Sequence, residues 1–207
     1  MILYKLTDQE GRTRARWNNA TQWGEGVTNA ATEPGTDLCT ASVIHAYVTP
    51  ELAAFLNPIH AKIENPILWE AEGEICARDG DLKVGCKSLT TLRQIPMPQP
   101  TTLQCVAFAI LCAKAVYGES SFVRWADDWL SGKDRSEKAA AAAWAAAAQA
   151  AAAAGAAEEW GAAAAQAAKA GVVAQAAKAA AAGAATINLP QIARDAMAQT
   201  WEIGATT

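Results

Sequence analysis

The chain has 207 residues, a formal net charge of −4 and 52% hydrophobic residues, and no basic block interrupts it. This length suits one ordinary domain with an appendage. A net negative charge without a clustered basic face argues against a dedicated nucleic-acid-binding protein. Because 13 of the 17 Lys and Arg residues lie within residues 1–135, a local site for an anion is still compatible with the composition.

The cysteines and the apolar segments indicate the cellular setting that we expect. The five cysteines are odd in number and form no Cys-x-x-Cys pair, and the first residues lack the apolar stretch of a signal peptide. We therefore expect reduced cysteines in a protein located in the cytoplasm. Acidic and basic residues interrupt the alanine-rich part of the chain, so we expect no membrane association.

The first half of the sequence alternates between short strand patterns and turns. The expected strands are 2–6, 12–17, 43–48, 67–76 and 86–95, with a long polar loop over 18–37. Thr49-Pro50-Glu51 predicts the start of a helix, and Asn57-Pro58 predicts its end. The turn Asp79-Gly80-Asp81 predicts that the last two strands form an antiparallel hairpin.

The second half of the sequence is helical by composition. An apolar helix is expected from Thr101 or Thr102 through Tyr117, and a third helix from Ser121 to Leu130. From position 139 to 185, 32 of 47 residues are alanine, the residue with the highest helix propensity. A last amphipathic helix is expected after Asn188 and Pro190.

These elements predict an α+β fold with a mostly antiparallel sheet and packed helices, followed by an alanine-rich helical hairpin or one long helix. The expected parts are an α+β head (1–135), an alanine-rich helical tail (136–186) and a short C-terminal amphipathic helix (187–207). Because an isolated alanine helix is marginal in water, we expect the tail to associate and the protein to form a homo-oligomer.

Three arginines alternate along the expected strand 12–17. Arg12, Arg14 and Arg16 would share one face, where their guanidinium groups could grip phosphates. The alternative is a solvated outer face of an edge strand, opposite Glu70, Glu72 or Glu74. Both interpretations place these arginines at the rim of the sheet.

Aromatic and histidine side chains lie near the same segments. Trp17 and Trp23 flank the polar loop, and they either form a slot for a nucleobase or cover the sheet edge. His45 and Tyr47 lie together on an expected strand, and His60 follows a turn. No spacing of the two histidines demands zinc, so we expect no metal and count all three as candidate ligand contacts.

Paired glutamates on the strand 67–76 are the candidates for catalysis. Glu70 and Glu72 project to one side of a strand, a spacing that serves ADP-ribosyltransferases, which act on NAD. That family carries a Ser-Thr-Ser-like strand before its glutamates, whereas Ser88-Leu89-Thr90-Thr91 follows them here. The sequence has no P-loop, dinucleotide glycine fingerprint or serine nucleophile motif, so no cofactor is expected.

Several runs of the sequence resemble a family of phage and prophage proteins with an α/β head and an alanine-rich C-terminal tail. The runs are HAYVTPELAAFLNPIHA, NPILWEAEGEI, LKVGC, LTTLRQIP, VAFAILCAKAVY and WADDWLSGKDRS. The resemblance covers roughly residues 38–136, and the tail in composition only. It implies a viral origin and the cytoplasm of an infected or lysogenic bacterium, but no particular activity.

The sequence thus leads to three hypotheses about function. The first is a non-enzymatic binding protein that sequesters an NAD-derived or cyclic nucleotide signal and so counters host immunity. The second is an ADP-ribosyltransferase-like enzyme that acts on NAD through Glu70 or Glu72. The third is a structural or protein-interaction role of the alanine-rich tail. The hypotheses differ in whether a small ligand is kept unchanged, altered or ignored.

Overall fold

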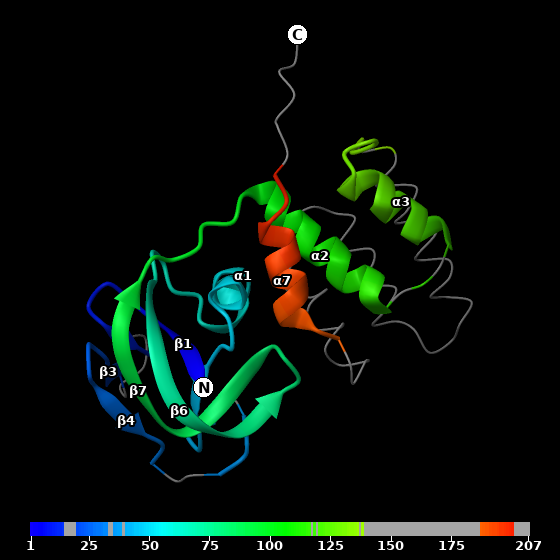
Figure 1. Cartoon of the computed structure of the whole chain (residues 1–207). Coiled ribbons are helices and arrows are strands. Elements are labelled where there is room, and N and C mark those ends of the chain that lie inside the picture. Colours follow the sequence, from blue (N-terminus) through cyan, green and yellow to red (C-terminus); the bar gives the residue numbers. More distant parts are fainter. Residues whose placement is uncertain are drawn as a thin grey trace. The chain divides into compact units, whose positions relative to one another are not determined.

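The protein combines α-helices with antiparallel β-sheet, the α+β class expected from the sequence (Figure 1). The structure is a computed structural model, and it describes residues 1–14, 20–32, 35–38, 40–116, 118, 120–136, 138 and 187–200. The chain divides into two compact units, Met1–Gln99 and Pro100–Thr207. The two helices expected after residue 100, which the sequence grouped with a 1–135 head, therefore belong to the second unit. The division falls at the proline-rich segment that follows the last strand.

The first unit is built on an antiparallel sheet. Its path runs from β1 (Ile2–Thr7) to β6 (Ile67–Asp79), then β7 (Lys83–Ile95) and β4 (Thr28–Ala30), and β5 (Ile44–Ala46) pairs with β7 beside β4. Two short strands, β2 (Arg12–Thr13) and β3 (Thr21–Gln22), form a separate pair; β2 lies in the expected strand 12–17, whereas β3 and β4 lie in the segment 18–37 that was expected to be loop.

The sheet closes on itself through two tyrosines. Tyr4 in β1 and Tyr47, just after β5, exchange two backbone hydrogen bonds of 2.9 Å. Since β1 also pairs with β6, and β5 pairs with β7, the four strands form a ring. A closed ring has an inside and an outside, and alternate residues of each strand face one or the other.

The predicted hairpin is confirmed, and it is longer than expected. β6 and β7 pair along their length around a turn at Gly80, whose φ of 49° suits glycine. The register shifts three times between Glu70 and Ala77, and such bulges bend and twist the strands. Figure 1 shows both strands curving, as the closed ring requires.

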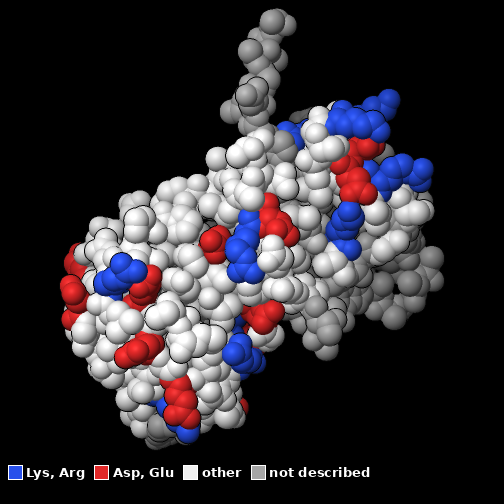
Figure 2. Space-filling view, viewed as in Figure 1, with Lys and Arg blue, Asp and Glu red and all other residues white. Residues whose placement is uncertain are grey.

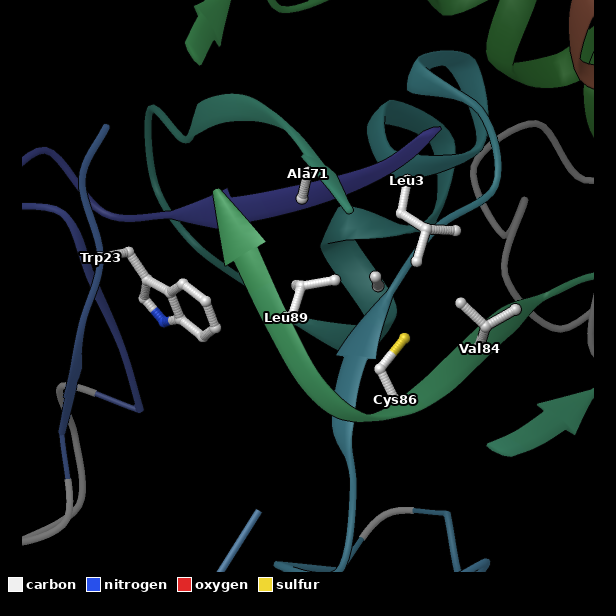
Figure 3. Close-up of a cluster of buried hydrophobic side chains, with 7 residues drawn as sticks. Leu3, Trp23, Ala71, Val84, Cys86 and Leu89 are labelled. Atoms are coloured by element: carbon white, nitrogen blue, oxygen red, sulfur yellow. The ribbon is translucent and has the colours of Figure 1, made fainter. Parts of the chain in front are cut away.

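Small and apolar side chains fill the inside of the ring. Figure 3 shows Leu3, Ala71, Val84, Cys86 and Leu89 directed toward one another, with the ring of Trp23 on one side. Ala46 completes this cluster of buried residues. The cysteine is reduced and acts as a small core residue, as the sequence predicts.

Helix α1 (Pro50–His60) starts as predicted but ends later. The Thr49 hydroxyl accepts a hydrogen bond from the Leu52 N–H at 3.2 Å and caps the helix. The predicted end at Asn57 is wrong, because the helix continues through Pro58 in its last turn. The Asn57 side chain donates to the carbonyl of Ile63 and accepts from the Ile63 N–H, which fastens the chain beyond the helix.

The second unit contains α2 (Thr102–Val116), α3 (Ser120–Leu130) and α7 (Leu189–Met197). A capping box opens α2: the Gln104 N–H donates to the Thr101 hydroxyl, and the Thr101 N–H donates to the Gln104 side chain. The Gln104 amide also donates to the carbonyl of Met197 at 2.7 Å and so joins α2 to α7.

Helix α3 buries aromatic side chains on one face, as the spacing of its tryptophans predicts. Phe122, Trp125 and Trp129 are all buried. The guanidinium of Arg135 lies 4.9 Å from the centre of the Trp129 ring, and its Nε donates to the Trp129 carbonyl. Most of the predicted alanine-rich tail, and residues 201–207 of the predicted C-terminal helix, lie outside the described residues. No helix in the described part of the chain is both long and apolar enough to cross a membrane.

The close approach of β6 and β7 at Gly73 allows a test of the ring. A Cβ added at Gly73 would lie 2.6 Å from the carbonyl oxygen of Ser88 and 2.9 Å from Leu89 Cδ1. We expect Gly73→Ala to lower the free energy of unfolding by about 1–3 kcal/mol, because the paired strands must separate. Urea unfolding followed by circular dichroism measures the change.

The matched control is Gly24→Ala, whose new Cβ would meet only Val27 Cγ2 at an ordinary 3.5 Å. We expect that change to stay within about 0.5 kcal/mol of the parent protein. Equal effects of the two substitutions would contradict the close pairing at Gly73.

Candidate functional site

A buried lysine lies inside the ring of strands. Lys5 follows Leu3 at the spacing of one strand face, and only 9% of its surface is exposed. Its ammonium donates a hydrogen bond of 2.8 Å to the backbone carbonyl of His45 in β5. It also lies 4.8 Å from the centre of the Trp23 ring. A carbonyl dipole and an aromatic face are thus its direct partners.

The position of Trp23 beside Lys5 is fixed by β2 and the turn before it. The indole N–H donates to the Thr13 hydroxyl at 2.9 Å, and the Trp23 backbone N–H donates to the Gly11 carbonyl at 2.7 Å. Gly11 has a φ of 73°, a backbone conformation that suits glycine. The tryptophan is held rigidly as one wall of the site.

The charged groups near Lys5 are cations. Burial and the nearby Arg14 lower the pKa of Lys5 to about 7, although Cys86 acts in the opposite direction. Burial also lowers the pKa of His45 to about 4, with further contributions from Lys5, Lys83, Arg14 and His60. We call Lys5, Arg14, His45, His60 and Lys83 the cationic cluster, although His45 itself is uncharged at neutral pH because of this low pKa. Among the described residues, no carboxylate lies within ion-pair distance of Lys5.

An aromatic pair adjoins the cationic cluster. The rings of Tyr47 and His60 are stacked, with centroids 6.1 Å apart and planes 9° from parallel. Tyr47 is held by its backbone bonds to Tyr4, and His60 by the end of α1. The sequence placed His45 and Tyr47 on one strand, and the structure brings His60 from the end of α1 against Tyr47.

The expected strand with three arginines on one face is not present in the described residues. β2 ends at Thr13, and Arg14 has a φ of 58°, so Arg12 and Arg14 do not lie on one strand face. Arg12 is engaged by two acids, Asp8 at 3.3 Å and Glu10, and is not available to a phosphate. Arg14 alone of the two approaches Lys5, and its guanidinium donates to the Thr40 carbonyl. Arg16 and Trp17 lie outside the described residues.

The candidate catalytic glutamates lie away from this cluster. Glu70 pairs in register with Tyr4, the neighbour of Lys5 that faces the opposite side of β1. Both carboxylate oxygens of Glu70 accept hydrogen bonds from Arg93, at 2.7 and 2.9 Å. Glu72 is exposed opposite Thr90. Glu70 thus serves a cross-strand ion pair on the outside of the ring.

Other features of the described residues do not form an alternative centre. No three His, Cys, Asp or Glu side chains among them converge to hold a metal ion. A groove of about 390 Å³ at the end of the hairpin is lined by Gln9, Pro66, Ile67, Leu68, Gln94, Ile95, Pro96 and Met97, none of them charged. On the face drawn in Figure 2, Lys and Arg are interspersed with Asp and Glu.

Sequence reasoning missed Lys5, although a signal was present. In the run ILYKL, Leu3 and Lys5 occupy the same face of a strand, so one side chain cannot be buried without the other. A lysine on an apolar strand face is a rare arrangement, because lysine is almost never fully buried without a partner. Its position within the first strand was sufficient to mark it as a candidate.

The chain was compared with protein-family models, curated proteins and solved structures, and none of them matches it.

The burial of Lys5 predicts a pH dependence of stability. Its pKa is about 7 in the folded chain and 10.5 as the reference for an unfolded one, so the unfolded state binds more protons between these values. The contribution of Lys5 to the free energy of unfolding is therefore highest above the unfolded pKa, and it is lost as the pH falls through the folded pKa. From about pH 7 to about pH 8.5 we expect the free energy of unfolding to rise by roughly 1–2 kcal/mol from this group.

Urea unfolding of Lys5→Met at the two pH values measures this contribution, and we expect the rise to be absent in the variant. Lys87→Met, which replaces an exposed lysine of β7, is the matched control and should keep the parent pH dependence. The same slope in Lys5→Met and in the parent protein would show that Lys5 does not titrate in this range.

Proposed function

We propose that the protein binds a small anionic ligand of nucleotide type at the cationic cluster and holds it unchanged, as a sequestering protein. In the phage or prophage setting that the sequence resemblance implies, such a protein would withdraw a nucleotide signal from the host. The observation that carries the proposal is the buried Lys5 ammonium, which lies near the cationic Arg14 and has no carboxylate at ion-pair distance among the described residues.

Burial of the Lys5 ammonium carries a free-energy cost. A buried ammonium without a counter-ion is unfavourable by several kcal/mol, and proteins normally pair such groups. The carbonyl of His45 and the ring of Trp23 offset part of that cost. An anion beside Lys5 and Arg14 would supply the missing negative charge, and binding of that anion would relieve the repulsion among the cations.

The aromatic residues favour a ligand that also carries a ring. Trp23 forms one wall beside Lys5, whereas the stacked Tyr47 and His60 lie on the opposite face of the strands, which also carries Tyr4. Bases stack on such rings with little dependence on their identity. A phosphate at the cations and a base at the Trp23 ring is the combination that a nucleotide provides.

Two observations favour binding over turnover. Burial raises the pKa of the Cys86 thiol to about 11, so the thiol near Lys5 is protonated and a weak nucleophile at neutral pH. Glu70, the candidate catalytic acid, is held by Arg93 on the opposite face of the sheet. The cluster thus offers positive charge and aromatic surface without the paired carboxylates that NAD chemistry would use.

A release assay tests the proposal. Purified protein is mixed with NAD and a panel of cyclic and NAD-derived nucleotides and filtered, the retained protein is heated, and both fractions are analysed by mass spectrometry. We expect one nucleotide to be depleted and then recovered unchanged. A nucleotide recovered in altered form would favour an enzyme, and a panel left entirely in the filtrate would overturn nucleotide binding.

Variants locate the binding site once a ligand is found. We expect Lys5→Met and Arg14→Ala each to weaken binding by about tenfold or more, because each removes a charge that faces the anion. Glu70→Gln breaks the ion pair with Arg93 on the other face and should leave affinity unchanged. Isothermal titration calorimetry measures the affinities, and a Glu70→Gln loss without a Lys5→Met loss would place the ligand elsewhere.

A further inference from the structure

The amine of Lys5 has the surroundings of a nucleophile as well as those of an anion contact. It lies inside the ring of strands beside an aromatic wall, with the cationic Arg14 nearby and with only 9% of its surface exposed. Lysines that are desolvated or placed next to another cation carry a substantial neutral fraction at neutral pH, and the neutral amine attacks carbonyl carbons. The exposed lysines of the chain, such as Lys87 on β7, lack this environment.

We propose that Lys5 captures small anionic aldehydes as a reversible imine. The inference rests on the proposed function for the location of the anion, and it narrows the ligand class to compounds that carry both a carbonyl and a phosphate-like group. A nucleotide with an opened sugar, or a sugar phosphate in its aldehyde form, has both.

The chemistry needs no further reactant. The lone pair of the neutral Lys5 amine attacks the aldehyde carbon, and the carbonyl electrons move to oxygen. A proton passes from nitrogen to that oxygen, which gives a carbinolamine. Loss of the hydroxyl group as water forms the C=N bond, so one amine and one aldehyde become one imine and one water. Addition of water reverses the step and returns the ligand unchanged.

The contacts around Lys5 suit this step. The amine uses one hydrogen bond, to the His45 carbonyl at 2.8 Å, and its remaining hydrogens face away from that bond. The apolar cluster of Leu3, Ala46 and Cys86 keeps the inside of the ring poor in water, which favours the imine over hydrolysis. The exposed Arg14, close to Lys5, offers a place for the anionic group of the aldehyde.

The neighbouring thiol does not compete for the aldehyde. Burial raises the pKa of Cys86 to about 11, so it carries almost no thiolate when the Lys5 amine is already partly neutral. The ring therefore presents one nucleophile, on β1, to a ligand that enters beside Arg14.

Reductive trapping tests the inference. The full-length protein is incubated near neutral pH with a substoichiometric amount of pyridoxal 5′-phosphate, an aldehyde that carries a phosphate and a ring, and sodium cyanoborohydride fixes any imine as a secondary amine. Peptide mapping by mass spectrometry then locates the label. We expect Lys5 to be labelled about tenfold or more faster than Lys87, because its neutral fraction is far larger.

Two controls separate reactivity from folding. The same reaction in urea should abolish the preference for Lys5, because the preference depends on the folded ring. Lys5→Arg keeps the positive charge but removes the primary amine, and it should lose the label while circular dichroism shows an unchanged fold. Pyridoxine 5′-phosphate has the ring and phosphate without the aldehyde, and its binding is measured alongside by calorimetry.

The outcomes distinguish this inference from the proposed function. Selective labelling of Lys5 supports imine capture. Binding of pyridoxine 5′-phosphate without selective labelling would overturn imine capture and leave the anion site intact. Labelling spread evenly over the exposed lysines, with no binding of pyridoxine 5′-phosphate, would overturn both.

Discussion

Closure of the strands into a ring is the constraint on which the rest of the first unit depends. The two backbone hydrogen bonds between Tyr4 and Tyr47 join β1 to the end of β5, and they complete a circuit through β7 and β6. Once the ring is closed, each strand residue lies inside or outside, and a shift of one position would exchange the two sets. Leu3 must lie inside to complete the core, and Lys5 is carried inside with it. The buried charge is therefore a consequence of register.

The surroundings of Lys5 reduce the cost of burying it without removing that cost. An ammonium that served stability alone would be expected beside a carboxylate, as Arg93 is beside Glu70 on the outside of the same strands. Lys5 instead meets a carbonyl, an aromatic face and further cations. Titratable groups with strongly shifted pKa values concentrate at functional sites, because function can require an environment that stability would avoid. The burial of Lys5 and the charges around it thus both indicate that Lys5 is the functional residue.

Local chemistry predicted the elements whose determinants lie close together in the sequence. The Thr49 cap, the capping box at Thr101 and the turn at Gly80 each depend on a few adjacent residues, and each is present in the structure. The prediction of an arginine strand was wrong because Arg14 adopts a positive φ and because Asp8 and Glu10 form ion pairs with Arg12. The alternation of residue types along the sequence does not reveal either feature. The predicted end of α1 was wrong because the preference of a residue before proline for extended angles is not absolute, and the helix continues through Pro58 to His60.

The cationic cluster could be predicted only in part, because its members meet through the ring closure. His45, Tyr47 and His60 were visible as candidates from residue type, but their proximity depends on β5 lying beside β1 and on α1 ending nearby. Lys5 was visible from strand alternation alone, yet its meaning required the absence of a nearby carboxylate among the described residues, which is a property of three-dimensional packing. The two faces of β1 and β6 then differ: the outer face carries Glu70 paired with Arg93, and the inner face carries Lys5 without a carboxylate at ion-pair distance among the described residues. A ligand that matches the inner face must bring negative charge with it, and this requirement holds whether the ligand is bound by charge alone or also through the amine.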